Sequence, residues 1–386
     1  MPDPRLAQRP EPRTLLVRGV NWLGDAVMTL PAMQRLRERF PQTTISLLTQ
    51  AKLQDLWRGQ PNIDKVISFD SSEQPWTVGR RLRPTDFDTA LVLPNSGRSA
   101  LEPWFAGIPN RVGYAGRWRR SLLTDPVTFP EHFVRLSKRS STEVKRLVNG
   151  ASAEAPQVSR PGTHQIHHYL HLAAALGCDP SPVAPRLDIG PAEVDAVFGQ
   201  LPELANHRPR GAGGQQTIWL GLNTSAAYGP AKCWPLDRFA AVVRTIPASL
   251  NCVWLHFGTS SDWDQGEQLK AASKRNVINL AGKTSLRQLM ALLKRCRALL
   301  TNDSGPMHLA AALGTPVIVP FGSTSPELTG PGLDRHGAHK ILRGTVPCSP
   351  CFRRTCPIDF RCMTSISVEH VVAAVHSVLA HQPTAN

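Results

Sequence analysis

Residues 14–48 read TLLVRGVNWLGDAVMTLPAMQRLRERFPQTTISLL, and this stretch decides the fold class. Thr14–Gly19 is a short apolar run that ends in a glycine, which is typical of a buried strand. From Ala26 to Phe40 the apolar residues recur at helical spacing, and Thr44–Leu48 is a second short apolar run. A strand, a helix and another strand in succession predict a parallel sheet that is covered by helices.

This alternation continues along the chain. The first half has two further apolar runs of strand length, at Val66–Phe69 and Thr89–Leu93. The second half repeats the pattern without repeating the sequence, and its strands are expected at Thr217–Leu222, Cys252–Phe257, Val277–Asn279, Ala298–Thr301 and Pro316–Phe321. We therefore predict an α/β protein with two Rossmann-like, doubly wound domains. Because such sheets bind ligands at the carboxyl ends of their strands, a cleft between the two domains is the expected site.

Composition places the domain boundaries. Residues 1–12 are polar and rich in proline, which predicts a flexible tail. The proline-containing stretch 180–185 is typical of a linker, so we expect an N-terminal domain over 13–183 and a C-terminal domain over 184–386. The polar residues 137–161 have no strand pattern, and they are expected to form a helix and a loop of the first domain.

The chain is strongly basic. Its 386 residues include 44 Lys and Arg against 29 Asp and Glu, a net charge of +15. The excess is spread, with a concentration at Arg111, Arg117, Arg119 and Arg120. Such a charge favours one of three partners: nucleic acid, an anionic membrane surface or a phosphorylated substrate. Since no RNP, KH or zinc-finger pattern is present, nucleic acid is the least favoured of the three.

The apolar segments are short. None approaches the ~18–20 residues of a membrane span, and the opening segment MPDPRLAQRPEPRT has no apolar stretch of signal-peptide type. A cytoplasmic protein is therefore expected. In that compartment the eight cysteines are expected to be thiols or metal ligands rather than disulfides.

Residues 18–25, RGVNWLGD, follow the first strand and precede a helix. They lack the GxGxxG pattern of a dinucleotide-binding turn, which argues against a nicotinamide cofactor. Asp25 has two interpretations. As the N-cap of the following helix it would be purely structural. As a carboxylate at the mouth of the cleft it would accept a proton from a substrate hydroxyl.

Residues 301–316, TNDSGPMHLAAALGTP, form a second turn between a strand and a helix. Capping rules place Asp303 or Ser304 before the helix and Pro306 in its first turn. The backbone N–H groups at 304–307 would then be available to a phosphate or pyrophosphate. A purely structural turn is the alternative, but the small size of this turn and the carboxylate at its tip favour function. His308, taken alone, is expected to be a packed helix residue.

Residues 223–235, NTSAAYGPAKCWP, also follow a strand and precede a helix, so they face the expected cleft. Lys232 would pair with a leaving phosphate, and Thr224 and Ser225 would donate hydrogen bonds to one. A solvated surface lysine is the alternative.

Four cysteines lie within one short loop over residues 348–362, namely Cys348, Cys351, Cys356 and Cys362. Their number and spacing suggest a structural zinc site, although the second and third gaps are short for two CxxC knuckles. Reduced cysteines that pack a tight loop are an equally good interpretation. The other four cysteines are scattered and are expected to be structural.

Taken together, these segments resemble a known family. NWLGDAVMTLPAMQRLRERFP, PNSGRSALEPWFAGIPNRVGY, AAYGPAKCWP, NDSGPMHLAAALGTPVIVPFGSTSPELTGP and PCSPCFRRTCPIDFRCM occur in the order of the heptosyltransferases of glycosyltransferase family nine. The resemblance spans residues 14–375, and the AAYGPAK and cysteine segments point to the heptosyltransferase II group over the heptosyltransferase I group. These are bacterial enzymes that transfer heptose from ADP-heptose to lipopolysaccharide.

The resemblance implies a fold and a reaction. The fold is GT-B, with the acceptor on the N-terminal domain and the nucleotide sugar on the C-terminal domain. The reaction inverts the anomeric centre in one displacement and needs no cofactor. The acceptor would be the first heptose of the inner core on lipid A, reached at the cytoplasmic face of the inner membrane of a Gram-negative cell. A family member with another heptose or acceptor, or a non-catalytic sugar-nucleotide-binding protein, is the alternative.

The resemblance also implies roles for particular residues. Asp25 matches the family's catalytic base, and Lys232 matches a lysine that contacts phosphate. The donor would further be bound by Thr224, Ser225, Asp303, Ser304, Gly305, Pro306, Met307 and His308. The acceptor would be bound by Asn21, Trp22, Gly24, Asn95, Ser96, Arg98, Arg117 and Arg120.

The chain departs from the family pattern in a few places. Asn223-Thr224-Ser225 stands where the family more often has Asn-Pro-Gly, and Cys233 stands where a basic residue is usual. Segments 137–163 and 205–216 are expanded. These differences leave the chemistry intact and concern the donor phosphate contacts and the acceptor preference.

Overall fold

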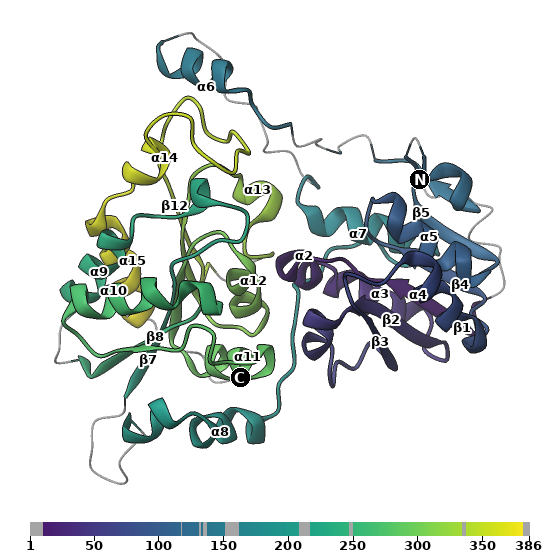
Figure 1. Cartoon of the computed structure of the whole chain (residues 1–386), viewed down its shortest axis with the longest axis horizontal. Helices are drawn as coiled ribbons and strands as arrows, with labels where there is room; N and C mark the ends of the chain where they lie inside the picture. The colour runs from purple at the N-terminus through teal and green to yellow at the C-terminus, as the bar shows by residue number, and fades with distance from the viewer. Residues whose placement is uncertain are drawn as a thin grey trace. The chain divides into compact units, whose positions relative to one another are not determined.

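A computed structural model of the chain describes residues 11–116, 118–130, 133, 137–150, 162–207, 217–246, 250–333 and 337–380. The chain divides into two compact units. The first contains residues 1–134 and 160–188, and the second contains residues 135–159 and 189–386. Each unit is built on one six-stranded parallel sheet with helices packed on it (Figure 1).

The sheet of the first unit has the strand order β3-β2-β1-β4-β5-β6. Its strands are β1 (Thr14–Arg18), β2 (Thr44–Gln50), β3 (Lys65–Phe69), β4 (Thr89–Val92), β5 (Asn110–Tyr114) and β6 (Asp125–Val127). The order reverses at β1, where Leu16 pairs with Ser46 on one side and Ala90 on the other. In doubly wound sheets this reversal is the place where ligands bind.

The helices of the first unit are α2 (Leu23–Met28), α3 (Leu30–Arg39), α4 (Pro75–Leu82), α5 (Gly97–Ala106) and α7 (Gln165–Ala174), with the 3-10 turns η1 (Ala51–Leu56), η2 (Arg83–Thr85) and η3 (Arg120–Leu122). The single helix expected over Ala26–Phe40 is two helices, which meet at Thr29. Pro31 lies in the first turn of α3, where it lacks the N–H that a continuous helix would need. The segment near Leu53–Arg58, which the sequence predicts as a helix, is part of the 3-10 turn η1.

The second unit repeats this architecture with the strand order β12-β11-β10-β7-β8-β9. Its strands are β7 (Ile218–Asn223), β8 (Cys252–His256), β9 (Val277–Asn279), β10 (Ala298–Thr301), β11 (Val317–Phe321) and β12 (Lys340–Arg343). Its helices are α6 (Ser141–Val148), α8 (Pro191–Gln200), α9 (Leu236–Thr245), α10 (Trp263–Ser273), α11 (Leu286–Arg295), α12 (Gly305–Ala312), α13 (Pro326–Thr329), α14 (Arg361–Thr364) and α15 (Val368–Ala380), with the 3-10 turns η4 (Pro202–His207), η5 (Pro230–Lys232) and η7 (Ser260–Asp262). None of the helices in the part of the chain that the structure describes has both the length and the apolar character of a membrane span.

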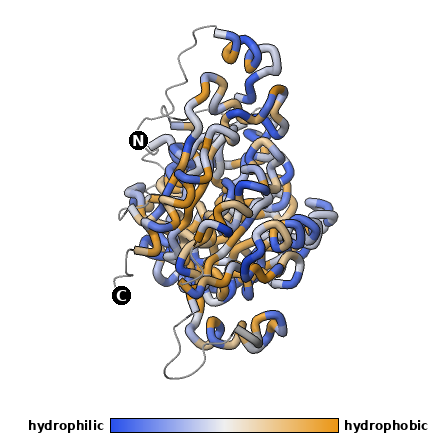
Figure 2. The backbone as a smooth tube through the Cα atoms, turned by 90° about the vertical axis from the view of Figure 1, so that its left-hand side faces the viewer, coloured by the Kyte–Doolittle hydropathy of each residue, from blue (hydrophilic) through white to orange (hydrophobic). Residues whose placement is uncertain are grey.

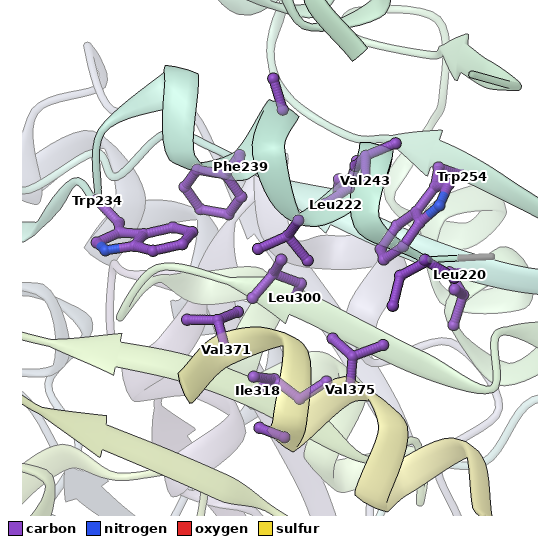
Figure 3. Close-up of a cluster of buried hydrophobic side chains, with 14 of the residues drawn as sticks. Leu220, Leu222, Trp234, Phe239, Val243, Trp254, Leu300, Ile318, Val371 and Val375 are labelled. Atoms are coloured by element: carbon purple, nitrogen blue, oxygen red, sulfur yellow. The ribbon is translucent and has the colours of Figure 1, made fainter. Parts of the chain in front are cut away.

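The core of the second unit lies between its sheet and two helices, α9 and α15 (Figure 3). The sheet contributes apolar side chains from adjacent strands, among them Leu220, Leu222, Leu300 and Ile318, and the helices contribute Phe239, Val243, Val371 and Val375. The central strands are buried on both faces, so they appear in the sequence as continuous apolar runs rather than alternating ones. Figure 2 colours the backbone by hydropathy, and hydrophobic stretches alternate along it with hydrophilic ones.

The division of the chain differs from the expected domain boundaries. The second unit begins at Ile189 rather than at residue 184, and it also includes residues 135–159, which were expected in the first domain. The reason is that α6 packs on the cysteine loop 348–362, where Val144 and Leu147 are buried against Cys348 and Cys351. An amphipathic helix joins the unit that covers its apolar face, whatever its position in the sequence.

Candidate functional site

A pocket of about 290 Å³ opens at the carboxyl ends of β1 and β4 in the first unit. Its lining comes from segments that are far apart in the sequence. They contribute Val20, Asn21, Trp22 and Asp25 after β1, Leu93, Pro94, Asn95 and Ser96 after β4, Tyr114 at the end of β5, and Gln165, His168 and Tyr169 from α7. The pocket therefore lies at the reversal of strand order, where a sheet of this kind binds its ligand.

A buried ion pair fixes the loop that leads from β1 to the pocket. Arg18, the last residue of β1, is 1% exposed, and its Nε lies 2.5 Å from Oε2 of the fully buried Glu102 on α5. The Arg18 guanidinium also donates to the carbonyl of Gly19 and, over 2.8 Å, to Oδ1 of Asn21. Sequence reasoning missed this pair, because its members are 84 positions apart and form no local pattern.

Asp25 lies in the first turn of α2 and lines the pocket. The N-cap of this helix is Trp22, so the interpretation of Asp25 as an N-cap is wrong. A negative charge in the first turn is favoured by the helix dipole. The Oδ1 atom of Asp25 is 3.5 Å from Nε2 of Gln165. This places a carboxylate at the wall of the pocket, where it can contact a bound hydroxyl group.

The structure gathers half of the residues that the sequence predicted for acceptor binding. Asn21, Trp22, Asn95 and Ser96 all line the pocket. Gly24 precedes Asp25 in α2 without being part of the lining. Arg117 lies outside the residues that the structure describes.

Two of the arginines predicted to reach the acceptor, Arg98 and Arg120, are not in the pocket lining. Arg98 on α5 donates to the carbonyl of Glu73, and Arg120 is exposed at the start of η3. The arginine that supports the pocket is Arg119, which donates to the carbonyl of Pro94 in the loop after β4. Burial lowers the pKa of Arg119 to about 10, so it stays a cation at neutral pH.

Sequence analysis missed the side chains that α7 and β5 contribute to the pocket. The amphipathic pattern over residues 167–176 predicts a helix close to α7, but such a pattern gives no sign of which pocket the helix lines. The hydroxyl of Tyr114 donates to the carbonyl of His168 over 2.8 Å, and Tyr169 accepts from Gln165. Burial raises the pKa of both tyrosines, so both phenols stay protonated at neutral pH.

In the second unit, Lys232 at the end of η5 forms an ion pair with Asp303, which follows β10. The Nζ and Oδ2 atoms are 2.6 Å apart, and the two side chains are only 13% and 4% exposed. The Thr324 hydroxyl donates to the same carboxylate oxygen over 2.5 Å. Lys232 is thus not the solvated surface lysine of the alternative interpretation, since its ammonium group is held at the carboxyl ends of the strands.

The start of α12 lies beside this ion pair in the chain. Ser304 is the N-cap, and its hydroxyl donates to Oδ1 of Asn223 over 3.0 Å. Of the residues at 304–307, Pro306 has no N–H, so Ser304, Gly305 and Met307 are the ones that can offer an amide to an anion. The Met307 and His308 side chains are buried, so Met307 can contact a ligand only through its backbone. His308 is therefore a packed residue, as expected.

Thr224 is buried and turned toward the interior, where its Oγ1 lies 3.0 Å from Nε2 of His256. The other ring nitrogen, Nδ1, lies 3.1 Å from Oδ1 of Asn279, whose amide nitrogen donates to Glu267. Because this fixes the amide orientation, Nδ1 carries the proton, and burial lowers the pKa of His256 and keeps the ring neutral. The Thr224 hydroxyl thus has two internal acceptors, Nε2 of His256 and, over 3.3 Å, Oε1 of Gln265. The expectation that Thr224 donates to a phosphate does not agree with this geometry, whereas Ser225 is half-buried.

The four clustered cysteines are free thiols that surround a very small cavity, lined by Cys348, Cys351, Cys356, Cys362 and Val144 among others. Burial raises the pKa of the Cys348 and Cys351 thiols, and that of Cys362 to about 12. Within the described residues no group of three or more His, Cys, Asp or Glu side chains is arranged to hold a metal ion. Cys348 and Cys351 pack against Val144 and Leu147 of α6, which is the contact that the packing interpretation describes.

The cysteine loop is hydrogen-bonded to the turn that carries Lys232. Tyr228 donates to the carbonyl of Phe352 over 2.7 Å, and the Ala231 N–H donates to the carbonyl of Arg354 over 3.0 Å. Gly229 has φ +144°, and a Cβ there would lie 2.6 Å from the same Arg354 carbonyl oxygen. The turn and the loop can approach each other only because this residue is glycine.

Comparison with known proteins agrees with this architecture. Residues 138–360, more than half of the chain, match the model of the family described as glycosyltransferase family 9 (heptosyltransferase). The chain belongs to glycosyltransferase family 9. Among its relatives in this family is lipopolysaccharide heptosyltransferase 2 of Escherichia coli K12, which is 30% identical over 354 residues, covering 86% of this chain and 90% of that protein.

Two further comparisons bear on the fold and on the branch of family 9. The solved structure of E. coli ADP-heptose LPS heptosyltransferase II matches with a TM-score of 0.74 and 26% identity, covering 95% of this chain and 98% of that one. This confirms the GT-B fold. Lipopolysaccharide heptosyltransferase 3 of E. coli K12 is 36% identical over 312 residues, covering 78% of this chain and 80% of that protein.

Proposed function

We propose that this protein is an inverting heptosyltransferase that transfers L-glycero-D-manno-heptose from ADP-heptose to the first heptose of the lipopolysaccharide inner core. The observation that carries the proposal is the pocket of the first unit, which has Asp25 in its wall. It is supported by the similarity to a heptosyltransferase 2 along most of the chain. The transfer needs no cofactor in this proposal.

Asp25 is the general base in this mechanism. Its carboxylate takes the proton from an acceptor hydroxyl, whose oxygen attacks the anomeric carbon from the face opposite ADP. The bond from that carbon to the diphosphate oxygen breaks, and inversion results from the single displacement. Proton removal by a positioned base contributes roughly 10²–10⁴-fold to such a reaction.

The leaving diphosphate gains negative charge as the bond breaks. We assign the stabilisation of that charge to Lys232 and to the amide groups at the start of α12, because a helix N-terminus and a held cation favour an anion. Asp303 holds the Lys232 ammonium at 2.6 Å and so orients it before the donor binds. Ser304, Gly305, Pro306, Met307 and His308 would form the backbone side of this donor site, with Ser225 near it.

Replacing Lys232 by methionine is expected to lower kcat by roughly 10²–10³-fold, the effect of removing one preorganised group that opposes developing charge. The measurement is ADP release at saturating donor and acceptor. A matched control is Lys283→Met, which removes another lysine with a 2.6 Å ion pair, on Glu203, at a more exposed site. Equal rates for the two variants would contradict the role assigned to Lys232.

The acceptor is an anionic glycolipid, so the protein would visit the inner face of the inner membrane. The sequence offers two basic segments for this contact, around 111–120 and 135–146. In the first, Arg119 is buried and Arg111 donates to the carbonyl of Leu122. Exposed basic side chains remain on and near α6, namely Lys138, Lys145 and Arg146. We therefore assign the membrane contact to the α6 segment.

Binding to vesicles that contain anionic lipid is expected to weaken as salt rises, because exposed charges are screened within about 10 Å at 0.1 M ionic strength. Co-sedimentation with phosphatidylglycerol vesicles over a salt series measures this, with phosphatidylcholine vesicles as the control. A Lys145→Glu, Arg146→Glu variant should bind the anionic vesicles more weakly. Binding that is unchanged by salt would refute an electrostatic contact.

A family member with another heptose or acceptor is the second candidate, favoured by the 36% identity to a heptosyltransferase 3. One experiment separates the two. The protein is incubated with ADP-heptose and a set of defined truncated core lipopolysaccharides, and the products are identified by mass spectrometry. Addition of one heptose to the core that ends in a single heptose supports the proposal, and addition only to a longer core supports the alternative. No product with any core would indicate a non-catalytic sugar-nucleotide-binding protein.

A further inference from the structure

Gln165 is a pocket residue that the proposed mechanism leaves without a role. It is the first residue of α7, and it lines the same pocket as Asp25 although the two are 140 positions apart. Its Nε2 atom lies 2.8 Å from the hydroxyl oxygen of Tyr169 and 3.5 Å from Oδ1 of Asp25. The amide group thus stands between a buried phenol and the carboxylate.

The orientation of this amide follows from its neighbours. An ionised carboxylate only accepts hydrogen bonds, so the nitrogen rather than the oxygen of the amide must face Asp25. Tyr169 lies one helical turn after Gln165, at the spacing that brings two side chains of a helix into contact. Its 2.8 Å bond holds the amide in place, so that the longer contact to Asp25 is directed by a group that is itself fixed.

We propose that Gln165 is a positioning residue that orients the Asp25 carboxylate and favours its ionised form, with Tyr169 as its anchor. This inference rests on the proposed function, in which Asp25 is the base. An N–H directed at a carboxylate favours the charged form and restricts rotation of the group. A base that is held ionised and aimed at the pocket is ready for proton transfer when the acceptor binds.

Other groups near Asp25 also bear charge or titrate. Tyr114, His168 and Tyr169 share its pocket, and Arg18, with its partner Glu102, lies beneath the loop before α2. Arg119 supports the opposite loop. The charged side chains of α3, which packs against α2, are bound elsewhere: Arg35 to Glu38, Arg37 to Asp64 and Arg39 to Glu11. His168 is the group whose titration could be mistaken for that of Asp25 in a pH profile.

The test is the pH dependence of kcat/KM for Gln165→Glu and Gln165→Leu. In Gln165→Glu, two neighbouring carboxylates repel each other when both are ionised, so the pair should keep one proton to higher pH. The acid limb of the kcat/KM profile should therefore move up by about one pH unit or more. In Gln165→Leu, which keeps the volume and lacks the donor, kcat should fall roughly tenfold and the limb should move up by less. ADP affinity, which reports on the second unit, should stay at the wild-type value in both.

Two controls make the result specific. Gln42→Glu adds the same carboxylate just before β2, at the amino ends of the parallel strands and so away from the pocket at their carboxyl ends. This variant should leave the pH profile unchanged. His168→Gln should keep the acid limb, and loss of the limb in that variant would assign it to His168 and overturn the inference. If Gln165→Glu does not fold, as judged by thermal unfolding, Gln165→Leu decides by the same profile.

The inference and the proposed function fail in different ways. An acid limb at the wild-type pH in both Gln165 variants, together with an inactive Asp25→Asn, would overturn the role of Gln165 and leave Asp25 as the base. Wild-type turnover in Asp25→Asn would overturn the assigned base and the inference with it.

Discussion

Asp25→Asn is expected to lower turnover at least roughly a hundredfold while ADP binding persists. The substitution keeps the shape of the side chain and removes its ability to accept a proton. Asp25 lies in the wall of the first unit's pocket, whereas Lys232, Asp303 and the start of α12 belong to the second unit. The loss should therefore appear in kcat, with little change in the Kd for ADP.

The comparison is made with Asp55→Asn, which removes a carboxylate from the 3-10 turn η1, where it pairs with the exposed Arg58. This control should retain wild-type turnover. ADP release measures kcat, and calorimetric titration measures ADP binding. If Asp25→Asn turned over at the wild-type rate, the enzyme would have to draw its base from another residue.

Glu102→Gln is expected to destabilise the protein by about 3–5 kcal/mol. Glu102 is fully buried and its Oε2 lies 2.5 Å from the Arg18 guanidinium, which is 1% exposed. Without the carboxylate, Arg18 would remain as a buried charge that no longer has its counter-ion, which is far more costly than losing a surface pair. Thermal unfolding of the first unit should shift down by roughly 10 °C.

A double variant distinguishes the charge effect from a packing effect. Arg18→Met with Glu102→Leu removes both charges and should recover most of the stability lost in Glu102→Gln, because an apolar pair of similar volume often replaces a buried ion pair at little cost. Asp55→Ala, which breaks the exposed pair with Arg58, should cost less than about 1 kcal/mol. A loss of that small size in Glu102→Gln would show that the pair is not a determinant of this fold.

The elements that could be predicted from the sequence are those with a strong local pattern. The apolar runs of β1, β2, β4, β7, β10 and β11 were found because strands buried on both faces are continuously apolar. The edge and near-edge strands β5, β6 and β12 were not found, since they are short and mix polar residues or glycine with apolar ones. The break between α2 and α3 is not decided by the sequence, because a proline early in a helix either is tolerated there or introduces a kink.

The candidate site was predictable where it follows a strand directly. Asp25, Lys232 and Asp303 each come shortly after a strand end, and the carboxyl ends of parallel strands meet at one edge of a sheet. The residues missed were those that reach a site from a different part of the chain. Arg98 and Arg120 were assigned from the family resemblance, and a matching position does not tell which way a long side chain turns.

By itself, the sequence determined the fold class, the strand-to-helix turns at which the functional residues lie, and membership of a glycosyltransferase family, because each of these is written in contiguous residues. The tertiary structure alone decided that α7 brings Gln165 and Tyr169 to Asp25, that Glu102 neutralises Arg18, that the Thr224 hydroxyl turns toward His256, and that α6 packs on the cysteine loop. These contacts join residues that are at least 32 positions apart, and whether such side chains meet depends on how the sheets and helices pack.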